Sequence, residues 1–156
     1  FKSKVGKKEQ YKIKSEYRTC GIKSQLKVLA GVKIFMEKTC KEFNVVLLTA
    51  RPYKKYFRIY SDTLKWLKDN DICYDAIVFD EEKEKYIINN FEPEQVAFCI
   101  DDDITNANKL SDSGFKVYLK KNLGIYSEDT LKRKLNEGIK IINGNIIEAI
   151  YNESKD

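Results

Sequence analysis

Val96-Ala97-Phe98-Cys99-Ile100 is an apolar run that leads directly into three aspartates, Asp101-Asp102-Asp103. Apolar residues then recur with helical spacing over residues 104–112, so a buried strand, a turn and a helix are predicted. The carboxyl ends of parallel strands are where open α/β folds bind their ligands. Crowded carboxylates repel one another unless a cation or a proton lies between them, and their hard oxygens suit Mg²⁺. The triplet therefore indicates either a magnesium site or an acidic turn that caps the next helix.

Strands alternate with helices on both sides of this stretch. The apolar runs predict strands at residues 45–48, 76–79, 96–100 and 115–119. The 3.6-residue periodicity predicts helices after Gly31, after Pro52, over 82–90 and over 104–112. In the helix after Pro52, the residues on the expected core side are Phe57, Tyr60, Leu64 and Leu67. This alternation predicts an α/β fold, a mostly parallel sheet with helices on both faces.

The two ends of the chain have weaker patterns. Residues 1–22 interleave lysines, Lys2 and Lys4 among them, with tyrosines. We expect a solvated strand or loop face there, with a nucleic-acid-contacting arm as the alternative. Residues 127–136 predict a helix capped by Ser127. Residues 139–151 contain Asn143-Gly144 and predict a hairpin, with a continued helix as the alternative.

Composition excludes several classes of function. The chain has 156 residues, a net charge of +5, no histidine and four cysteines without a CxxC pair. A zinc site, a disulfide framework and any histidine-based catalytic mechanism are therefore unexpected. No apolar run is long enough to span a membrane, and free cysteines are typical of the reducing cytoplasm.

Polar side chains follow each of the first three predicted strands. The first strand runs into Thr49-Ala50-Arg51-Pro52, the second is followed by Lys83 and Lys85, and the third ends in the aspartates. A hydroxyl, an ammonium group and carboxylates at one edge of a parallel sheet suit a phosphate with Mg²⁺. Singly, each has a simpler interpretation: Thr49 as a helix N-cap, the lysines as solvated charges, and Arg51 as part of a surface ion pair.

These motifs resemble those of the haloacid dehalogenase (HAD)-like phosphohydrolases. The second motif of the family resembles residues 45–52, and its third, lysine motif resembles Lys83 or Lys85 ahead of Tyr86-Ile87-Ile88. The fourth motif resembles Phe98-Cys99-Ile100-Asp101-Asp102. The resemblance extends over residues 29–119. The Thr-Ala-Arg-Pro sequence and the paired aspartates are most similar to the 5′-nucleotidase and polynucleotide 3′-phosphatase branches.

The resemblance implies a Mg²⁺-dependent phosphatase that acts on a nucleotide or a nucleic-acid end through an aspartyl-phosphate. Thr49 would bind the transferring phosphoryl group, Lys85 (or Lys83) would stabilise its charge, and Arg51 would reach the substrate phosphate. Asp102 would be the Mg²⁺ ligand, supported by Asp101, whereas Asp103 falls outside the pattern and is assigned to the N-terminus of the next helix. The implied fold is one three-layer domain over residues 1–156, with 1–28 as a small cap-like or basic segment.

One motif of the family has no counterpart here. The first motif, DxDxT/V, supplies the nucleophile, and no such sequence occurs in the chain. In the family its strand is central, between the strands that correspond to residues 45–48 and 96–100. Without that strand, two buried strands would face a gap with unpaired backbone groups. We therefore expect the motif upstream of Phe1.

Two other functions fit parts of the pattern. A catalytically inactive relative would keep the fold as a phosphate-binding or interaction module. A Toprim-like nuclease also has a DxD after a buried strand, here Asp101 and Asp103, but it needs a catalytic glutamate where Thr49-Ala50-Arg51 stands. A response-regulator receiver would carry its acidic pair first in the chain, which is the wrong order.

The sequence of the complete gene tests the expected nucleophile. We predict a DxD motif directly upstream of Phe1, because the metal otherwise lacks its partner carboxylates. An open reading frame without that motif would favour the phosphate-binding module instead.

Overall fold

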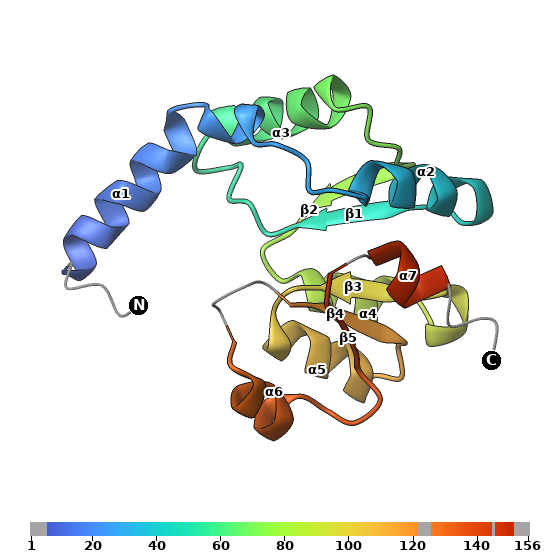
Figure 1. The fold of residues 1–156 in the computed structure, drawn as a ribbon. Coiled ribbons are helices and arrows are strands. Elements are labelled where there is room, and N and C mark those ends of the chain that lie inside the picture. The colour runs from blue at the N-terminus through green and yellow to red at the C-terminus, as the bar shows by residue number, and fades with distance from the viewer. Residues whose placement is uncertain (1–5, 122–125, 145, 152–156) are drawn as a thin grey trace. The chain divides into compact units, whose positions relative to one another are not determined.

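The computed structural model describes residues 6–121, 126–144 and 146–151, so Lys2 and Lys4 lie outside the described residues. The chain divides into two compact units, Phe1–Glu81 and Glu82–Asp156. Helices alternate with two small parallel sheets, and the predicted α/β class is confirmed. Figure 1 traces the elements in order: α1 (Lys7–Thr19), η1 (Ile22–Gln25), α2 (Val32–Glu42), β1 (Val46–Thr49), α3 (Arg58–Asp69), β2 (Ala76–Phe79), α4 (Lys83–Asn90), η2 (Pro93–Gln95), β3 (Cys99–Asp101), α5 (Ile104–Asp112), β4 (Val117–Lys120), α6 (Glu128–Lys134), β5 (Lys140–Ile142) and α7 (Ile146–Tyr151).

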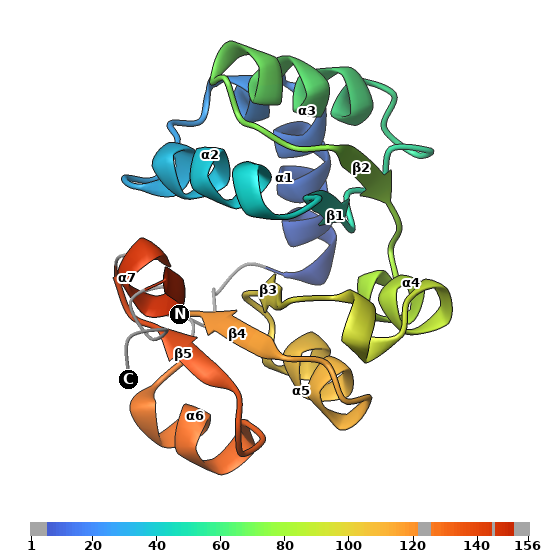
Figure 2. The same ribbon diagram turned by 90° about the vertical axis from the view of Figure 1, so that its right-hand side faces the viewer.

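The second unit is built on the parallel sheet β3-β4-β5, seen in Figure 2. Helix α5 connects β3 to β4 and packs against both strands, as the crossover between parallel neighbours requires. Ala107 of α5 and Leu119 of β4 are completely buried in the apolar cluster beneath this sheet. Asp101 lies opposite Leu119 in the register, so the aspartates begin where the buried part of β3 ends.

The first unit contains the two-stranded parallel sheet β1-β2, with Thr49 opposite Phe79 at its carboxyl end. Helix α3 connects the two strands. Val46 is 38 % exposed and the rest of β1 is only half-buried, so the strand is less covered than its continuous apolar run predicts. Within the described residues β1 pairs with β2 alone, and in the other sheet β3 pairs with β4 alone. Each sheet therefore has an edge without a described neighbouring strand.

The expectation of a strand or loop near the N-terminus is wrong, because residues Lys7–Thr19 form helix α1. This segment contains neither glycine nor proline, and most of its residues are good helix formers. Lys12 and Glu16 form an i,i+4 ion pair on its surface. The sequence shows no helical pattern here because α1 buries no side chain, so its apolar positions carry no information on packing.

The predicted core side of α3 is right only in part: Leu67 is buried and Leu64 is half-buried, as expected. Phe57 precedes the helix and is 91 % exposed, and Tyr60 is 46 % exposed. The buried residues of the helix are Ile59, Asp62, Thr63 and Leu67, of which Ile59, Thr63 and Leu67 lie at i, i+4 and i+8. Thr63 tolerates burial because its hydroxyl donates to the Ile59 carbonyl within the helix.

The C-terminal segment is neither a hairpin nor a continued helix. Strand β5 pairs in parallel with β4, with Leu119 opposite Ile141, and α7 follows it. Parallel pairing buries Ile142 completely. Gly144 does adopt the predicted positive φ, 93°, but in the segment between a strand and a helix.

Most other elements match their predictions. Helices α2, α4 and α5 and strand β2 are present within a residue or so of the expected bounds, and β1, β3 and β4 overlap the predicted strands. Helix α6 is capped by the Ser127 hydroxyl, which accepts from the Thr130 backbone amide, as predicted. Across the described ranges, the helices are too short or too polar to cross a bilayer.

Candidate functional site

Asp101 ends strand β3 and its carboxylate is the centre of a compact set of contacts. The side chain is 8 % exposed. Its Oδ1 accepts from the backbone amides of Asp102 at 2.8 Å and Asp103 at 2.9 Å. Its Oδ2 accepts from Lys83 Nζ at 2.7 Å. A nearly buried carboxylate is thus compensated by one cation and two backbone donors, which burial of a charge requires.

Lys83 is the first residue of α4 and its side chain is 21 % exposed. A cation at a helix N-terminus faces the positive end of the helix dipole, which is unfavourable. The Asp101 carboxylate offsets that repulsion and the cost of partial burial together. The pair therefore joins the start of α4 to the end of β3.

A second ion pair, which the sequence analysis missed, fixes α4 against α5. Glu84 is 6 % exposed, and its Oε1 accepts from Lys109 Nζ at 2.5 Å. The hydrogen bond from Lys109 lowers the pKa of Glu84, which keeps the buried carboxylate charged. A glutamate inside a charged run carries no sequence signal for burial, so only the packing of α4 on α5 reveals it.

Lys85, which the sequence analysis placed in the catalytic role, has a different partner. Its Nζ lies 2.5 Å from Glu82 Oε1, and both side chains are about 60 % exposed. The hydrogen bond to Glu82 raises the pKa of Lys85. Of the two candidate lysines, the structure brings Lys83 to Asp101 and leaves Lys85 in a surface pair.

The other two aspartates of the triplet have separate environments. Asp103 is the N-cap of α5, and its Oδ1 accepts from the amides of Thr105 at 2.8 Å and Asn106 at 3.1 Å. The assignment of Asp103 to the helix N-terminus is confirmed, and this use of its carboxylate counts against a nuclease that employs Asp101 and Asp103 as a metal-binding pair. Asp102 lies between them and is exposed at the carboxyl edge of the sheet.

Thr49 and Arg51 belong to the first unit. Thr49 is the last residue of β1 and does not cap α3, which begins at Arg58 with Phe57 at its N-cap. Arg51 donates from Nη1 to Thr63 Oγ1 at 2.6 Å. Partial burial lowers the pKa of the Arg51 guanidinium, and nearby Tyr17 opposes that shift. The alternative of Arg51 as part of a surface ion pair has no support among its described contacts.

The predicted constellation thus falls into two groups. Lys83, Asp101 and Asp102 come together in the second unit, whereas Thr49 and Arg51 stand on the first. Among the described residues there is no cluster of three or more acidic or thiol side chains poised for a metal. Mg²⁺ is commonly held by one or two carboxylates together with waters and substrate phosphate, so the chemistry of Asp101 and Asp102 fits this ion.

Replacing Lys83 by methionine tests the pairing. Lys83→Met keeps most of the side-chain volume but leaves the Asp101 carboxylate without its cation. We expect a loss of roughly 1–3 kcal/mol in the free energy of unfolding, between the ~0–1 of exposed pairs and the ~3–5 of fully buried ones. Chemical denaturation followed by circular dichroism measures it.

Lys85→Met is the matched control on the same helix, and we expect it to change the free energy of unfolding by about 0.5 kcal/mol or less. Equal losses in the two variants would mean that Lys83 has no special partner and would contradict the description of the site.

Comparison of the chain with protein-family models, with curated proteins and with solved structures finds no match in any of the three. The resemblance of the motifs at the strand ends is therefore the ground on which a family is proposed.

Proposed function

We propose that the protein is a Mg²⁺-dependent phosphohydrolase that removes a phosphate group from a nucleotide or a nucleic-acid end through an aspartyl-phosphate. The observation that carries the proposal is the 2.7 Å pair between Lys83 Nζ and Asp101 Oδ2 at the carboxyl end of β3, with exposed Asp102 beside it. This edge of a parallel sheet is the ligand-binding edge of open α/β folds.

Each side chain has a role that follows from its chemistry. The Lys83 ammonium group would attract a phosphate and stabilise its transferring oxygens. Asp101 holds Lys83 and the turn at residues 101–103 in place through its three contacts. Asp102 offers the metal a carboxylate, and bound Mg²⁺ would supply Lewis-acid stabilisation of the phosphoryl oxygens.

In the first unit, two residues are proposed to bind phosphate. The Thr49 hydroxyl is a donor for a phosphoryl oxygen, and the Arg51 guanidinium suits a phosphate because its donors form a planar fork. In the HAD-like family the first aspartate of the DxD motif is the nucleophile: its carboxylate attacks phosphorus, the substrate alkoxide leaves, and water then hydrolyses the acyl phosphate.

The three-layer sandwich of the HAD-like superfamily is part of the same proposal. Its support is that β1 and β3 each pair on only one side within the described residues. A further parallel strand at such an edge would satisfy backbone groups that are otherwise left to water.

We also propose that the protein works in the cytoplasm. Cys20, Cys40, Cys73 and Cys99 are all free thiols. A chain of this size with four unpaired cysteines is typical of a reducing compartment.

Hydrolysis of p-nitrophenyl phosphate and of nucleoside monophosphates by the purified protein tests the activity. We expect phosphate release that requires Mg²⁺ and stops with a chelator. Asp102→Ala should lower the rate by at least ~100-fold, because even residues that only support a metal ligand commonly cost 10- to 100-fold.

Asp129→Ala is the matched control, since Asp129 is an exposed partner of Arg133 on α6. It should hydrolyse the substrates at the unmodified rate. Hydrolysis that survives Asp102→Ala would rule out the assignment of the metal ligand. Binding of phosphate without turnover would instead support an inactive phosphate-binding module.

A further inference from the structure

Four cations and three tyrosines gather in the first unit, in a group that we name the basic–aromatic cluster. Its members are Tyr11, Tyr17 and Arg18 of α1, Lys23 of η1, and Arg51, Lys55 and Tyr56 from the segment between β1 and α3. Helix α1 contacts both α3 and η1, which brings these three stretches of sequence together.

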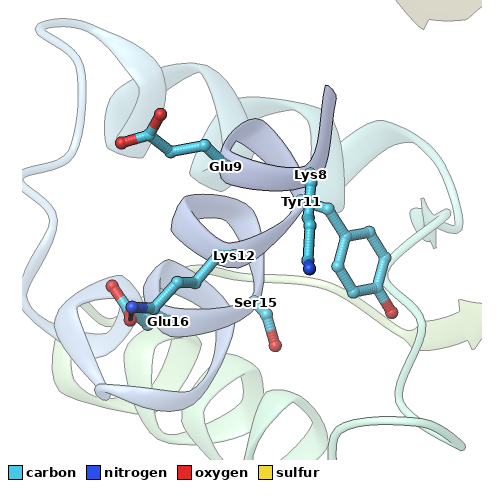
Figure 3. A pocket seen from close by; sticks show the side chains of 6 residues that line it. All are labelled: Lys8, Glu9, Tyr11, Lys12, Ser15 and Glu16. Carbon is cyan, nitrogen blue, oxygen red and sulfur yellow. Dashed lines mark ion pairs between the residues drawn. The ribbon is translucent and has the colours of Figure 1, made fainter. Parts of the chain in front are cut away.

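One side of α1 faces the segment between β1 and α3. Tyr11, Ser15 and Arg18 lie at i, i+4 and i+7 and thus on one side of the helix. Figure 3 shows Lys8, Tyr11 and Ser15 along that side, whereas Glu9 and the Lys12–Glu16 pair extend from the other. All six of these residues, Glu9 and Glu16 included, line an open hollow of about 610 Å³.

Each tyrosine of the cluster has a cation over its ring. Lys55 Nζ lies 5.0 Å from the centre of the Tyr11 ring, and Lys23 Nζ lies 5.3 Å from that of Tyr17. Arg18 lies 5.5 Å from the centre of the Tyr56 ring. Tyr56 is buried, but Tyr11 is 54 % and Tyr17 42 % exposed, so these two rings have surface left for a ligand. Such contacts hold the rings and the cations in fixed mutual positions.

The positive charge of the cluster is not balanced by acids. In the part of the chain that the structure describes, none of Arg18, Lys23, Arg51 and Lys55 has an ion pair with a carboxylate, and the nearby acids Glu16 and Asp62 pair with Lys12 and Arg58.

Burial, and after it the like charges of Arg51 and Arg18, lower the pKa of Lys23, since like charges repel one another. A bound anion would relieve that repulsion.

We propose that the basic–aromatic cluster binds single-stranded nucleic acid, with the cations on successive phosphates and the exposed faces of Tyr11 and Tyr17 stacked on bases. Proteins commonly bind single-stranded nucleic acid with interleaved cations and aromatic rings, because the unpaired bases are free to stack on the rings. Paired bases in a duplex would leave both rings unused. The inference goes beyond the proposed function because it concerns binding, which is measured with hydrolysis blocked.

Fluorescence anisotropy of a labelled oligothymidylate, titrated with the purified protein in the presence of a chelator, measures this binding. With about four phosphate contacts, the logarithm of the association constant should fall with the logarithm of salt concentration with a slope of about −3. This readout uses the unmodified protein, so it does not depend on the folding of any variant. A slope near zero would overturn the proposal.

Two variants separate the parts of the cluster. Arg18→Gln with Lys55→Gln removes two cations and should weaken binding by roughly 10- to 30-fold at ~0.1 M salt. Tyr11→Leu should weaken it by roughly 5-fold or more, since one base loses its stacking partner. Circular dichroism confirms that each variant remains folded.

Lys41→Gln with Lys68→Gln is the matched control, because it removes the same charge from exposed positions on α2 and α3. It should weaken binding by about 2-fold at most. An equal loss in control and cluster variants would show that net charge alone attracts the strand, and would overturn the proposal.

Competitors identify the ligand class. Oligothymidylate should displace the probe far better than inorganic polyphosphate, duplex DNA or vesicles of anionic phospholipid. Equal competition by polyphosphate or duplex, or preference for the vesicles, would contradict binding through stacked bases. Because the chelator blocks hydrolysis, failure of this test leaves the phosphatase proposal standing, and the reverse also holds.

Discussion

The ion pair between Lys83 and Asp101 is the contact on which the candidate site depends. It places a nearly buried carboxylate at the end of β3 and compensates it with the first residue of α4. The same carboxylate accepts two backbone amides and so fixes the turn in which Asp102 is exposed. Without the lysine, the nearly buried carboxylate would lack a compensating cation, and the turn would lose its anchor. The position of Asp102, the proposed metal ligand, thus depends on the ion pair that compensates Asp101 one residue away.

The two units differ in how completely they are packed. The second has a continuous apolar cluster around Ala107 and Leu119, beneath three parallel strands. The first has a two-stranded sheet that is only half-buried, and a polar helix, α1, that buries no side chain. Helix α1 is instead held through cation–π contacts and through packing on α3 and η1. That arrangement gives the first unit its exposed tyrosines and unbalanced cations, which are features of a binding surface.

Much of the fold could be predicted because, in most helices and strands, the apolar residues that recur with helical or strand spacing are also the residues that are buried. Helix α5, strand β2 and the caps at Asp103 and Ser127 follow from local patterns that the packing respects. The buried face of α3 could be predicted only in part: Leu67 is buried as expected, whereas Thr63 is buried through hydrogen bonds rather than hydrophobicity. The secondary structure of the two terminal segments was also predicted wrongly. Helix α1 has no buried face that would produce a helical pattern, and the pairing of β5 depends on β4, which is distant in the sequence.

The residue types of the candidate site and their places at the strand ends could be predicted, but the contacts between them could not. The aspartates, Thr49 and a lysine stand at strand ends, and that much is visible in the sequence. Which lysine meets Asp101 depends on where α4 begins, and its first residue, Lys83, is the one directed there. Burial of Glu84 against Lys109 has no sequence signal at all.

Paramagnetic broadening by Mn²⁺, which takes the same hard oxygen ligands as Mg²⁺, tests the central claim that Asp102 is the metal ligand beside the Lys83–Asp101 pair. In amide NMR spectra of the purified protein, substoichiometric Mn²⁺ should broaden the signals of Asp102 and Asp103 first. Excess Mg²⁺ should reverse the effect, and Asp102→Ala should abolish it. Broadening centred on another acidic segment such as Glu128–Asp129, or unchanged by Asp102→Ala, would contradict the account.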